Sequence, residues 1–330
     1  MADLNKVVLS TRVRLARNYK NYFFVPKMNK ETAEKIVEIT KDAVMNSSQS
    51  SLEEFEFINS AELVKKGGVL LEEHLISPGI LKQEKEKGVI LSKNKELSIM
   101  INEEDHLRIQ AIKQGYNPDE ALRLANLFDD LAEEKNEYAF SEKYGYLTAC
   151  PTNLGTGIRV SVMLHIPAIA ITGKLTGLIR SVNRLGIEVR GAYGEGTGGD
   201  GNIYQFSNRD TLGVSEEEII NKIKNITSQI VEEELSLREQ IRNDELYDRI
   251  YRSLGLLKSS YKMDYKEFLK LNSNAVLGAD MGILNIDSDE FKKLWVKCAP
   301  WHIAELSQEY KDCVKRDIKR AEILRVQLEK

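Results

Sequence analysis

The chain has 330 residues, 42% of them hydrophobic, which suffices for one large domain with a substantial core and a smaller second domain. Its formal net charge of −4 argues against a surface devoted to nucleic acid or anionic lipid, so any anion site has to be local. No apolar run approaches the ~20 residues of a membrane span, and no signal-peptide profile is evident. With only three cysteines, the pattern predicts a cytoplasmic protein with reduced thiols.

The first two thirds of the chain mix strand and helix patterns. Strands are expected over residues 7–15, 88–102 as a hairpin, 188–191 and 202–207. Helices are expected after an Asn29 cap, from Pro118 to about 138, and over 174–185. Because strict βαβ alternation is absent, the pattern favours an α+β fold with a central, mainly antiparallel sheet flanked by helices.

The character of the chain changes at Ser215. Ser215 and Glu218 form a capping box, isoleucines follow at helical spacing, and the remainder is almost entirely helical. We therefore place a boundary near residue 240. It separates a catalytic domain, residues 1–240, from a small all-helical C-terminal domain, residues 241–330.

Five arginines stand beside strand-like or glycine-containing stretches: Arg12, Arg14, Arg108, Arg159 and Arg190. Arg12 and Arg14 lie two apart on one predicted strand, so their side chains share a face and can grip phosphate oxygens. The alternative is ordinary salt bridging to the many carboxylates. Taken together, the five arginines favour an anion cradle.

The segment NEEDHLR, residues 102–108, places carboxylates where a strand is expected to end. Strand alternation predicts that Glu103 and Glu104 point to opposite sides, so that one enters a pocket and the other meets water or an arginine. A pocket carboxylate beside an arginine cluster suits a cationic acceptor next to an anionic donor. The alternative is a solvated acidic turn.

Two further segments can approach a ligand. CPTNLGTG, residues 150–157, combines Cys150 with a glycine turn, and YGEGTGGDGN, residues 193–202, is a glycine-rich loop that contains Glu195. Cys150 is either a thiolate in a cationic setting or an inert buried thiol. The chain lacks the Walker signature and the HRD and DFG motifs of eukaryotic-type protein kinases. Its four histidines are too scattered to indicate a zinc site, so no protein-held metal is expected.

Four of these blocks, STRVRLARN, INEEDHLRI, CPTNLGTGIR and VRGAYGEG, resemble in content and order the signature blocks of the ATP:guanidino phosphotransferases. Within that superfamily the chain is similar to the bacterial protein-arginine kinases. It reaches the first block without a preceding helical domain and continues through residues 241–330 beyond the catalytic region. In that extension VKRDIKRA, residues 314–321, matches the RDxxRA motif of the protein-arginine kinases.

The resemblance implies residue roles. The five arginines, together with His106, are expected to bind ATP, which is used with Mg²⁺. Glu104 and Glu195 are expected to hold the acceptor guanidinium, with Cys150 against the same group. Met163 stands where phosphagen kinases carry a histidine near the adenine, and the adenine contacts are left open. Arg316, Asp317 and Arg320 are expected to read phosphoarginine. From the residues alone, a surface ion pair is the preferred explanation of the last three, and only the resemblance reverses that preference.

The function implied is transfer of the ATP γ-phosphoryl group to arginine side chains of proteins. That mark either directs them to a Clp-type unfoldase and protease or regulates stress-response repressors. The resemblance further implies a homodimer and a zinc-binding activator protein, with no membrane and no direct nucleic-acid partner. Three alternatives remain: a kinase for free arginine or another small guanidino compound, a non-catalytic phosphoarginine-binding regulator, and, disfavoured by net charge, an arginine-rich nucleic-acid binder.

Overall fold

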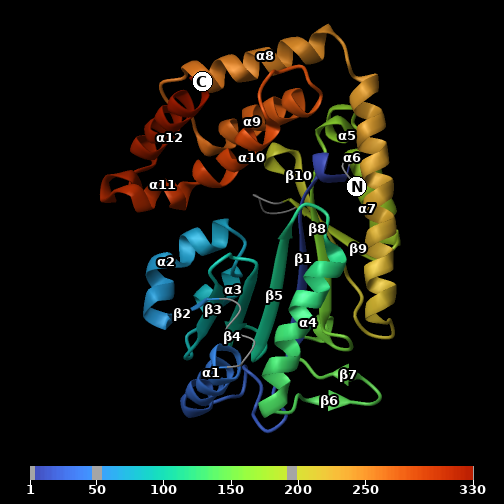
Figure 1. The fold of residues 1–330 in the computed structure, drawn as a ribbon, viewed down its shortest axis with the longest axis vertical. Coiled ribbons are helices and arrows are strands. Elements are labelled where there is room, and N and C mark those ends of the chain that lie inside the picture. The colour runs from blue at the N-terminus through green and yellow to red at the C-terminus, as the bar shows by residue number, and fades with distance from the viewer. Residues whose placement is uncertain (1–3, 47–53, 192–198, 330) are drawn as a thin grey trace.

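The computed structural model describes residues 4–46, 54–191 and 199–329 (Figure 1). Its centre is one eight-stranded sheet in which every neighbouring pair is antiparallel. In spatial order the strands are β2 (Phe55–Asn59), β3 (Gly88–Ser92), β4 (Leu97–Ile101), β5 (Leu107–Gln114), β1 (Val8–Arg17), β8 (Ile158–His165), β10 (Ile203–Asn208) and β9 (Ile187–Gly191). A small hairpin, β6 (Phe140–Ser141) with β7 (Gly145–Tyr146), lies beside it. The expected α+β fold with an antiparallel sheet is confirmed.

Helices cover one face of this sheet and part of the other. The first seven are α1 (Lys30–Met45), α2 (Ser60–Glu72), α3 (Pro78–Lys82), α4 (Pro118–Lys135), α5 (Pro167–Ile171), α6 (Leu175–Arg184) and α7 (Glu216–Gln240). The main hydrophobic core lies where the inward residues of β1, such as Val13 and Leu15, meet α1, α4 and α7. On the opposite face a smaller cluster beneath α2 and α3 buries Val89 and Met100. The remainder of that second face carries the arginines.

Local sequence explains several element boundaries. Asn29 caps α1 by accepting a hydrogen bond from the backbone N–H of Thr32, as predicted. The Ser215 and Glu218 capping box opens α7 with both of its hydrogen bonds formed. The expected hairpin over 88–102 is β3 and β4. Among the described residues, no helix combines the length and the apolar character that crossing a membrane requires.

Residues from 241 onward, here called the C-terminal region, form five α-helices and one short 3-10 helix (Gln308–Lys311) in the described part of the chain. The α-helices are α8 (Asp244–Ser259), α9 (Tyr265–Asp280), α10 (Ser288–Lys297), α11 (Pro300–Leu306) and α12 (Cys313–Leu328). They enclose a hydrophobic cluster of their own, which Ile203 of β10 joins. Figure 1 shows this region arching over one end of the sheet, from α7 on one side to α2 on the other.

Candidate active site

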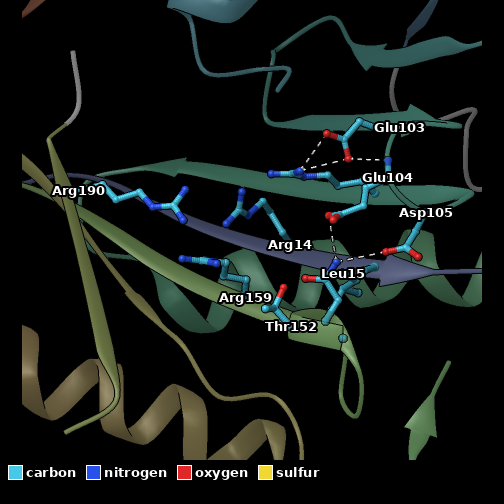
Figure 2. Close-up of a pocket in the computed structure, with 12 residues that line it drawn as sticks. Arg14, Leu15, Glu103, Glu104, Asp105, Thr152, Arg159 and Arg190 are labelled. Carbon is cyan, nitrogen blue, oxygen red and sulfur yellow. Dashed lines mark hydrogen bonds and ion pairs between the residues drawn. The ribbon is translucent and has the colours of Figure 1, made fainter. Parts of the chain in front are cut away.

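Four of the five predicted arginines line one pocket on the second face of the sheet, a cavity of about 210 Å³ (Figure 2). They come from four different strands: Arg14 from β1, Arg108 from β5, Arg159 from β8 and Arg190 from β9. Glu103, Glu104 and Asp105 line the same pocket at its other end. The structure therefore brings together the cationic and anionic groups that the sequence separates by up to about 180 residues.

Strand register concentrates the positive charge. Arg14 lies directly opposite Arg159 across the β1–β8 pair, a like-charge juxtaposition that is unfavourable without a compensating anion. Burial and then the charges of the surrounding arginines, Arg12 first among them, lower the pKa of Arg14 well below its ordinary value. The arrangement favours an anionic ligand, because phosphate oxygens would relieve the repulsion and accept the guanidinium hydrogen bonds.

Arg12 shares the face of Arg14 but lines an adjoining, smaller pocket with His74, Met163 and Gln205. Its Nη2 donates to Gln205 Oε1 at 2.8 Å. Burial and then the charges of the neighbouring arginines lower the pKa of Arg12 to about 9. Arg12 thus belongs to the same electrostatic cluster, although it does not line the main pocket.

Glu188 was not singled out from the sequence, and it organises two of the arginines. Its carboxylate pairs with Arg159, and Oε1 accepts from Arg190 Nε at 2.9 Å and from Nη2 at 2.7 Å. Burial raises the pKa of Glu188, but the hydrogen bonds from Arg190 and the charge of Arg159 outweigh it, and the net shift is downward. The signal was present, because Glu188 lies two residues before Arg190 and shares its face of β9.

The turn between β4 and β5 corrects the alternation argument for NEEDHLR. Strand β4 ends at Ile101, so residues 102–106 form a turn, and Asn102 adopts a positive φ of 60°. Glu103 and Glu104 consequently both reach the same pocket. Buried Glu103 accepts from Ser77 Oγ at 2.5 Å and lies 3.3 Å from Arg108 Nη1, whereas Glu104 is exposed to the pocket. One carboxylate pairs with an arginine and the other is available for a ligand.

Asp105 ties this turn to the loop that contains Cys150. Its Oδ1 accepts from Ala149 N at 2.6 Å and from Asn18 Nδ2 at 2.7 Å, and its Oδ2 accepts from Asn153 Nδ2 at 3.2 Å. Burial is the leading cause of a raised pKa for Asp105, although these hydrogen bonds oppose it. The carboxylate therefore acts as a structural link, and its place next to Glu104 in the chain does not by itself distinguish the two roles.

His106 does not face the pocket, and we reassign it from the ATP contacts to the support of the turn. The ring is completely buried, its Nδ1 accepts from Tyr19 N at 3.1 Å, and its Nε2 lies 2.9 Å from the Phe23 carbonyl oxygen. Burial lowers the pKa of His106 to about 4, so the ring is neutral near pH 7. Both nitrogens are used by backbone groups that fix the chain after β1.

Cys150 lines a second, wider pocket of about 410 Å³ that shares Glu103 and Glu104 with the arginine pocket. Its other walls include Val25 and Pro151. The Cys150 side chain is half-buried, and its Sγ lies 3.0 Å from the hydroxyl of Thr152. Glu104 thus stands where two cavities meet, one cationic and one with apolar walls.

Glu195, expected in the acceptor site, lies outside the described residues. The RDxxRA residues lie on α12, and they differ in accessibility. Arg316 and Asp317 are partly exposed, while Arg320 is 1% exposed. Arg320 donates to the carbonyl oxygens of Cys298 and Met263, each at 2.8 Å, and to Asp317 Oδ1 at 2.6 Å. The surface ion-pair alternative does not describe it, since its guanidinium is a buried anchor for α12 and for Asp317.

A metal ion finds no cage of protein ligands in the part of the chain that the structure describes. No group of three or more His, Cys, Asp or Glu side chains there is arranged to hold one. The donor set of the main pocket nevertheless suits Mg²⁺ bound to a nucleotide, because Mg²⁺ is commonly held by substrate phosphates with only one or two carboxylates. Such an ion arrives with the nucleotide and is held mainly by its phosphates, which the arginines of the pocket suit.

Two known protein families match successive parts of the chain. A family described as "ATP:guanido phosphotransferase, C-terminal catalytic domain" matches residues 35–237, and "Protein-arginine kinase McsB C-terminal domain" matches residues 243–330. The chain is 43% identical over 329 residues to a protein-arginine kinase of Bacillus pumilus, covering 98% of this chain and 90% of that one. It is 41% identical over 326 residues to a protein-arginine kinase of Halothermothrix orenii, covering 98% and 93%.

Solved structures show the same fold. The duplicated taurocyamine kinase from Schistosoma mansoni, with bound transition state analog components, has a TM-score of 0.64 and 25% identity. That likeness covers 81% of this chain but only 39% of the duplicated kinase. A lombricine kinase has a TM-score of 0.62 at 22% identity, covering 73% of this chain and 70% of that one, and shares the fold.

Proposed function

The chain belongs to the protein-arginine kinases, and from this premise we propose how its residues divide the work of phosphoryl transfer between an ATP donor and an arginine side chain. The observation that carries the proposal is the position of Glu104, exposed where the arginine pocket meets the pocket of Cys150. The first pocket suits the donor phosphates and the second suits the acceptor.

Arg14, Arg108, Arg159 and Arg190 hold the ATP phosphates. Guanidinium forks match phosphate oxygens, and the charge that they concentrate offsets the charge of the transferring phosphoryl group. Mg²⁺ enters with ATP as part of the donor substrate and supplies further charge neutralisation between the phosphates. Arg12 lies on the same sheet face and adds its charge to the cationic cluster around Arg14.

The acceptor guanidinium enters from the Cys150 pocket. A guanidinium is a poor nucleophile because its lone pairs are delocalised and its pKa exceeds 12. Glu104 corrects this by accepting hydrogen bonds from the group, aiming one nitrogen at the γ-phosphorus and taking its proton as the N–P bond forms. The bond between the γ-phosphorus and the β–γ bridging oxygen breaks in the same step, and ADP leaves. Glu195 is the second carboxylate in this role, and Cys150 packs against the guanidinium.

The walls of the acceptor pocket fit an arginine within a polypeptide better than free arginine. Val25, Pro26 and Pro151 offer apolar surface, and the Lys85 ammonium is engaged by the Val25 carbonyl oxygen at 2.5 Å. A free amino acid brings two charged groups that this wall would have to desolvate, whereas a peptide backbone is neutral. Free arginine is the alternative substrate, and the test below compares its turnover with that of a protein substrate.

The test uses Glu104→Gln, which keeps the shape of the side chain and removes its charge. We expect phosphoarginine formation on an unfolded casein to fall by about 10²–10³-fold while ATP affinity stays near wild type, because only the acceptor loses its base. Glu142→Gln, at an exposed position on the β6–β7 turn, is the matched control and should retain full activity. Wild-type rates for Glu104→Gln, or faster turnover of free arginine than of casein, would contradict the assignment.

The RDxxRA motif forms a second, regulatory site in this proposal. Arg316 and Asp317 contact the phosphate and the guanidinium of a phosphoarginine, and buried Arg320 positions Asp317 rather than touching the ligand. Arg316→Ala should abolish any response of activity to added phosphoarginine and leave basal transfer intact. An unchanged response would remove this site from the proposal.

The cellular setting is proposed on the family relationship alone. The enzyme acts in the cytoplasm as a homodimer with a zinc-binding activator, and the proteins that it marks pass to a Clp-type unfoldase or are stress-response repressors. Phosphoarginine mapping by mass spectrometry on proteins co-expressed with the chain, with Glu104→Gln as the inactive control, tests the first step. Absence of phosphoarginine that depends on Glu104 would contradict it.

A further inference from the structure

Among the described residues, two contacts of the C-terminal region with the rest of the chain stand out. The first lies at the end of β8 and β10, where Ser273 of α9 hydrogen-bonds His165 Nε2 at 2.8 Å and Asn202 Nδ2 at 2.9 Å. The second is a smaller contact between α11 and α2, on the other side of the sheet (Figure 1). The C-terminal region thus bridges the two halves of the sheet, and the α11 contact meets the helix that leads towards the pocket.

Charged groups hold the α11 contact together. Glu72, the last residue of α2, accepts from the backbone N–H groups of Trp301 and His302, at 2.8 and 3.1 Å, and lies 2.9 Å from His302 Nδ1. His302 Nε2 lies 3.3 Å from Glu73. Hydrogen bonds to Glu72 and Glu73 raise the pKa of His302 to about 9, so the ring is a cation near neutral pH. Lys95 also pairs with Glu73, at 2.7 Å.

Packing reinforces this contact at Gly68. A Cβ atom at Gly68 would collide with the indole ring of Trp301, so the absence of a side chain lets the ring lie against the backbone of α2. Trp301 and His302 are consecutive on α11, and Gly68 and Glu72 are one helical turn apart on α2. Two unrelated interactions, one steric and one ionic, therefore fix the same pair of helices.

Residues 72–77, here called the 72–77 segment, lead from the end of α2 to the active site. Its carbonyl groups are fastened to the sheet, because Gln110 Nε2 donates to His74 O at 2.8 Å and Ser98 Oγ donates to Leu75 O at 2.6 Å. His74 adopts a positive φ of 59°, a conformation that a non-glycine residue keeps only when its surroundings impose it.

Both ends of the proposed substrate site meet the 72–77 segment. His74 lines the pocket of Arg12, and Ser77 donates to Glu103 at 2.5 Å. Glu103 in turn pairs with Arg108 Nη1 at 3.3 Å and accepts from the backbone N–H of Glu104 at 2.8 Å. A shift of α2 would therefore displace both Arg108, which holds the donor, and Glu104, which holds the acceptor.

We propose that His302 is a positioning residue for phosphoryl transfer: by clamping Glu72 and Glu73 it fixes the 72–77 segment, and through Ser77 and Glu103 it aligns Arg108 with Glu104. A short, contiguous series of contacts thereby links the position of the C-terminal region to the turn between β4 and β5, which contains Glu104. The inference rests on the proposed roles of Glu104 and Arg108.

Two variants disturb the contact by different means. His302→Gln removes the cation, and Gly68→Ala displaces the Trp301 ring while replacing a glycine inside α2 with a better helix former. We expect each to lower kcat for casein phosphorylation roughly three- to thirtyfold, with kcat and kcat/KM falling together, because the alignment matters in the transition state. Since Gly68→Ala favours the helix, unfolding of α2 does not explain its loss of activity.

Lys66→Met is the matched control. Lys66 also lies on α2, and its hydrogen bond and ion pair go to Glu56 at 2.5 Å; α11 acts on it only through the longer-range charge of Glu305. Its kcat should stay within about twofold of wild type, as expected for loss of an exposed ion pair. Ser77→Ala combined with His302→Gln completes a double-mutant cycle, and the double variant should be no slower than the slower single variant, because both break one chain of contacts.

Three results would overturn the inference: wild-type kcat in either contact variant, an equal loss in Lys66→Met, or additive losses in the double-mutant cycle. These outcomes are distinct from failure of the site itself. If Glu104→Gln were active, the catalytic assignment would fall. If Glu104→Gln is inactive while His302→Gln and Gly68→Ala are fully active, only the positioning role of His302 falls.

Discussion

The two faces of the central sheet place arginine in opposite surroundings, and strand β1 contributes to both. On the face that α4 covers, Arg17 is 1% exposed, pairs with Asp129 at 2.8 Å and has its guanidinium carbon 3.6 Å from the centre of the Tyr146 ring. On the opposite face, Arg14 stands against Arg159. For Arg17 burial lowers the pKa, but Asp129 and the tyrosines outweigh it and the net shift is upward, whereas the pKa of Arg14 falls.

This difference in surroundings distinguishes Arg17, which stabilises the fold, from Arg14, which is placed to bind a ligand. A buried cation with a carboxylate and an aromatic partner has its charge compensated within the protein. The charge of a cation that faces other cations is not compensated within the protein. Its partner has to be an anion that binds from outside.

Arg17→Met should destabilise the protein most. It leaves Asp129 buried without its cation, which typically costs about 3–5 kcal/mol of the free energy of unfolding. Denaturant unfolding followed by circular dichroism measures this. Arg123→Met, which removes an exposed pair with Glu120, is the control and should change stability by less than about 0.5 kcal/mol. A loss below about 1 kcal/mol for Arg17→Met would break the comparison.

Arg14→Met should instead impair function without weakening the fold. We expect kcat/KM for ATP to fall by about 10²–10³-fold, because a donor of charge-assisted hydrogen bonds to phosphate is lost. The free energy of unfolding should be unchanged or higher, since Arg159 loses a like-charged neighbour. Steady-state kinetics and denaturant unfolding on the same preparation measure both quantities. Destabilisation similar to that of Arg17→Met would contradict the assignment.

MgATP should stabilise the wild-type protein by supplying the missing anion. At a concentration one hundred times its Kd, a ligand that binds only the folded state adds about 2.7 kcal/mol to the free energy of unfolding. Thermal unfolding with and without MgATP should show the gain, and raising the salt concentration should reduce it. Arg14→Met should show little gain, and an equal gain in that variant would indicate that the nucleotide binds elsewhere.

Glu188→Gln should have the smallest effect, and it should change ATP affinity and kcat in opposite directions. The Glu188 carboxylate competes with phosphate for Arg159 and Arg190 but also holds them in place. We expect somewhat tighter ATP binding and somewhat lower kcat, each by about fivefold or less, because the pair is partly exposed. Nucleotide titration and steady-state rates separate the two. Weaker ATP binding would show that Glu188 only positions the arginines.

Much of the catalytic chemistry could be predicted because local patterns carry it. Side-chain parity placed Arg12 and Arg14 on one face of β1, capping residues placed the starts of α1 and α7, and the order of the four blocks pointed to guanidino phosphotransfer. Such features depend on residues that are neighbours in the chain, where backbone geometry alone decides which side chains meet.

What only the tertiary structure decided is which of these polar groups has a partner. His106 and Arg320 resemble ligand-binding residues in the sequence, yet both are buried against backbone groups. Arg14 and Arg159, 145 positions apart, oppose each other only because of the register of β1 and β8, and Glu72 meets His302 only because α11 folds back onto α2. Burial and long-range pairing depend on how distant elements pack, and no local pattern in the chain encodes them.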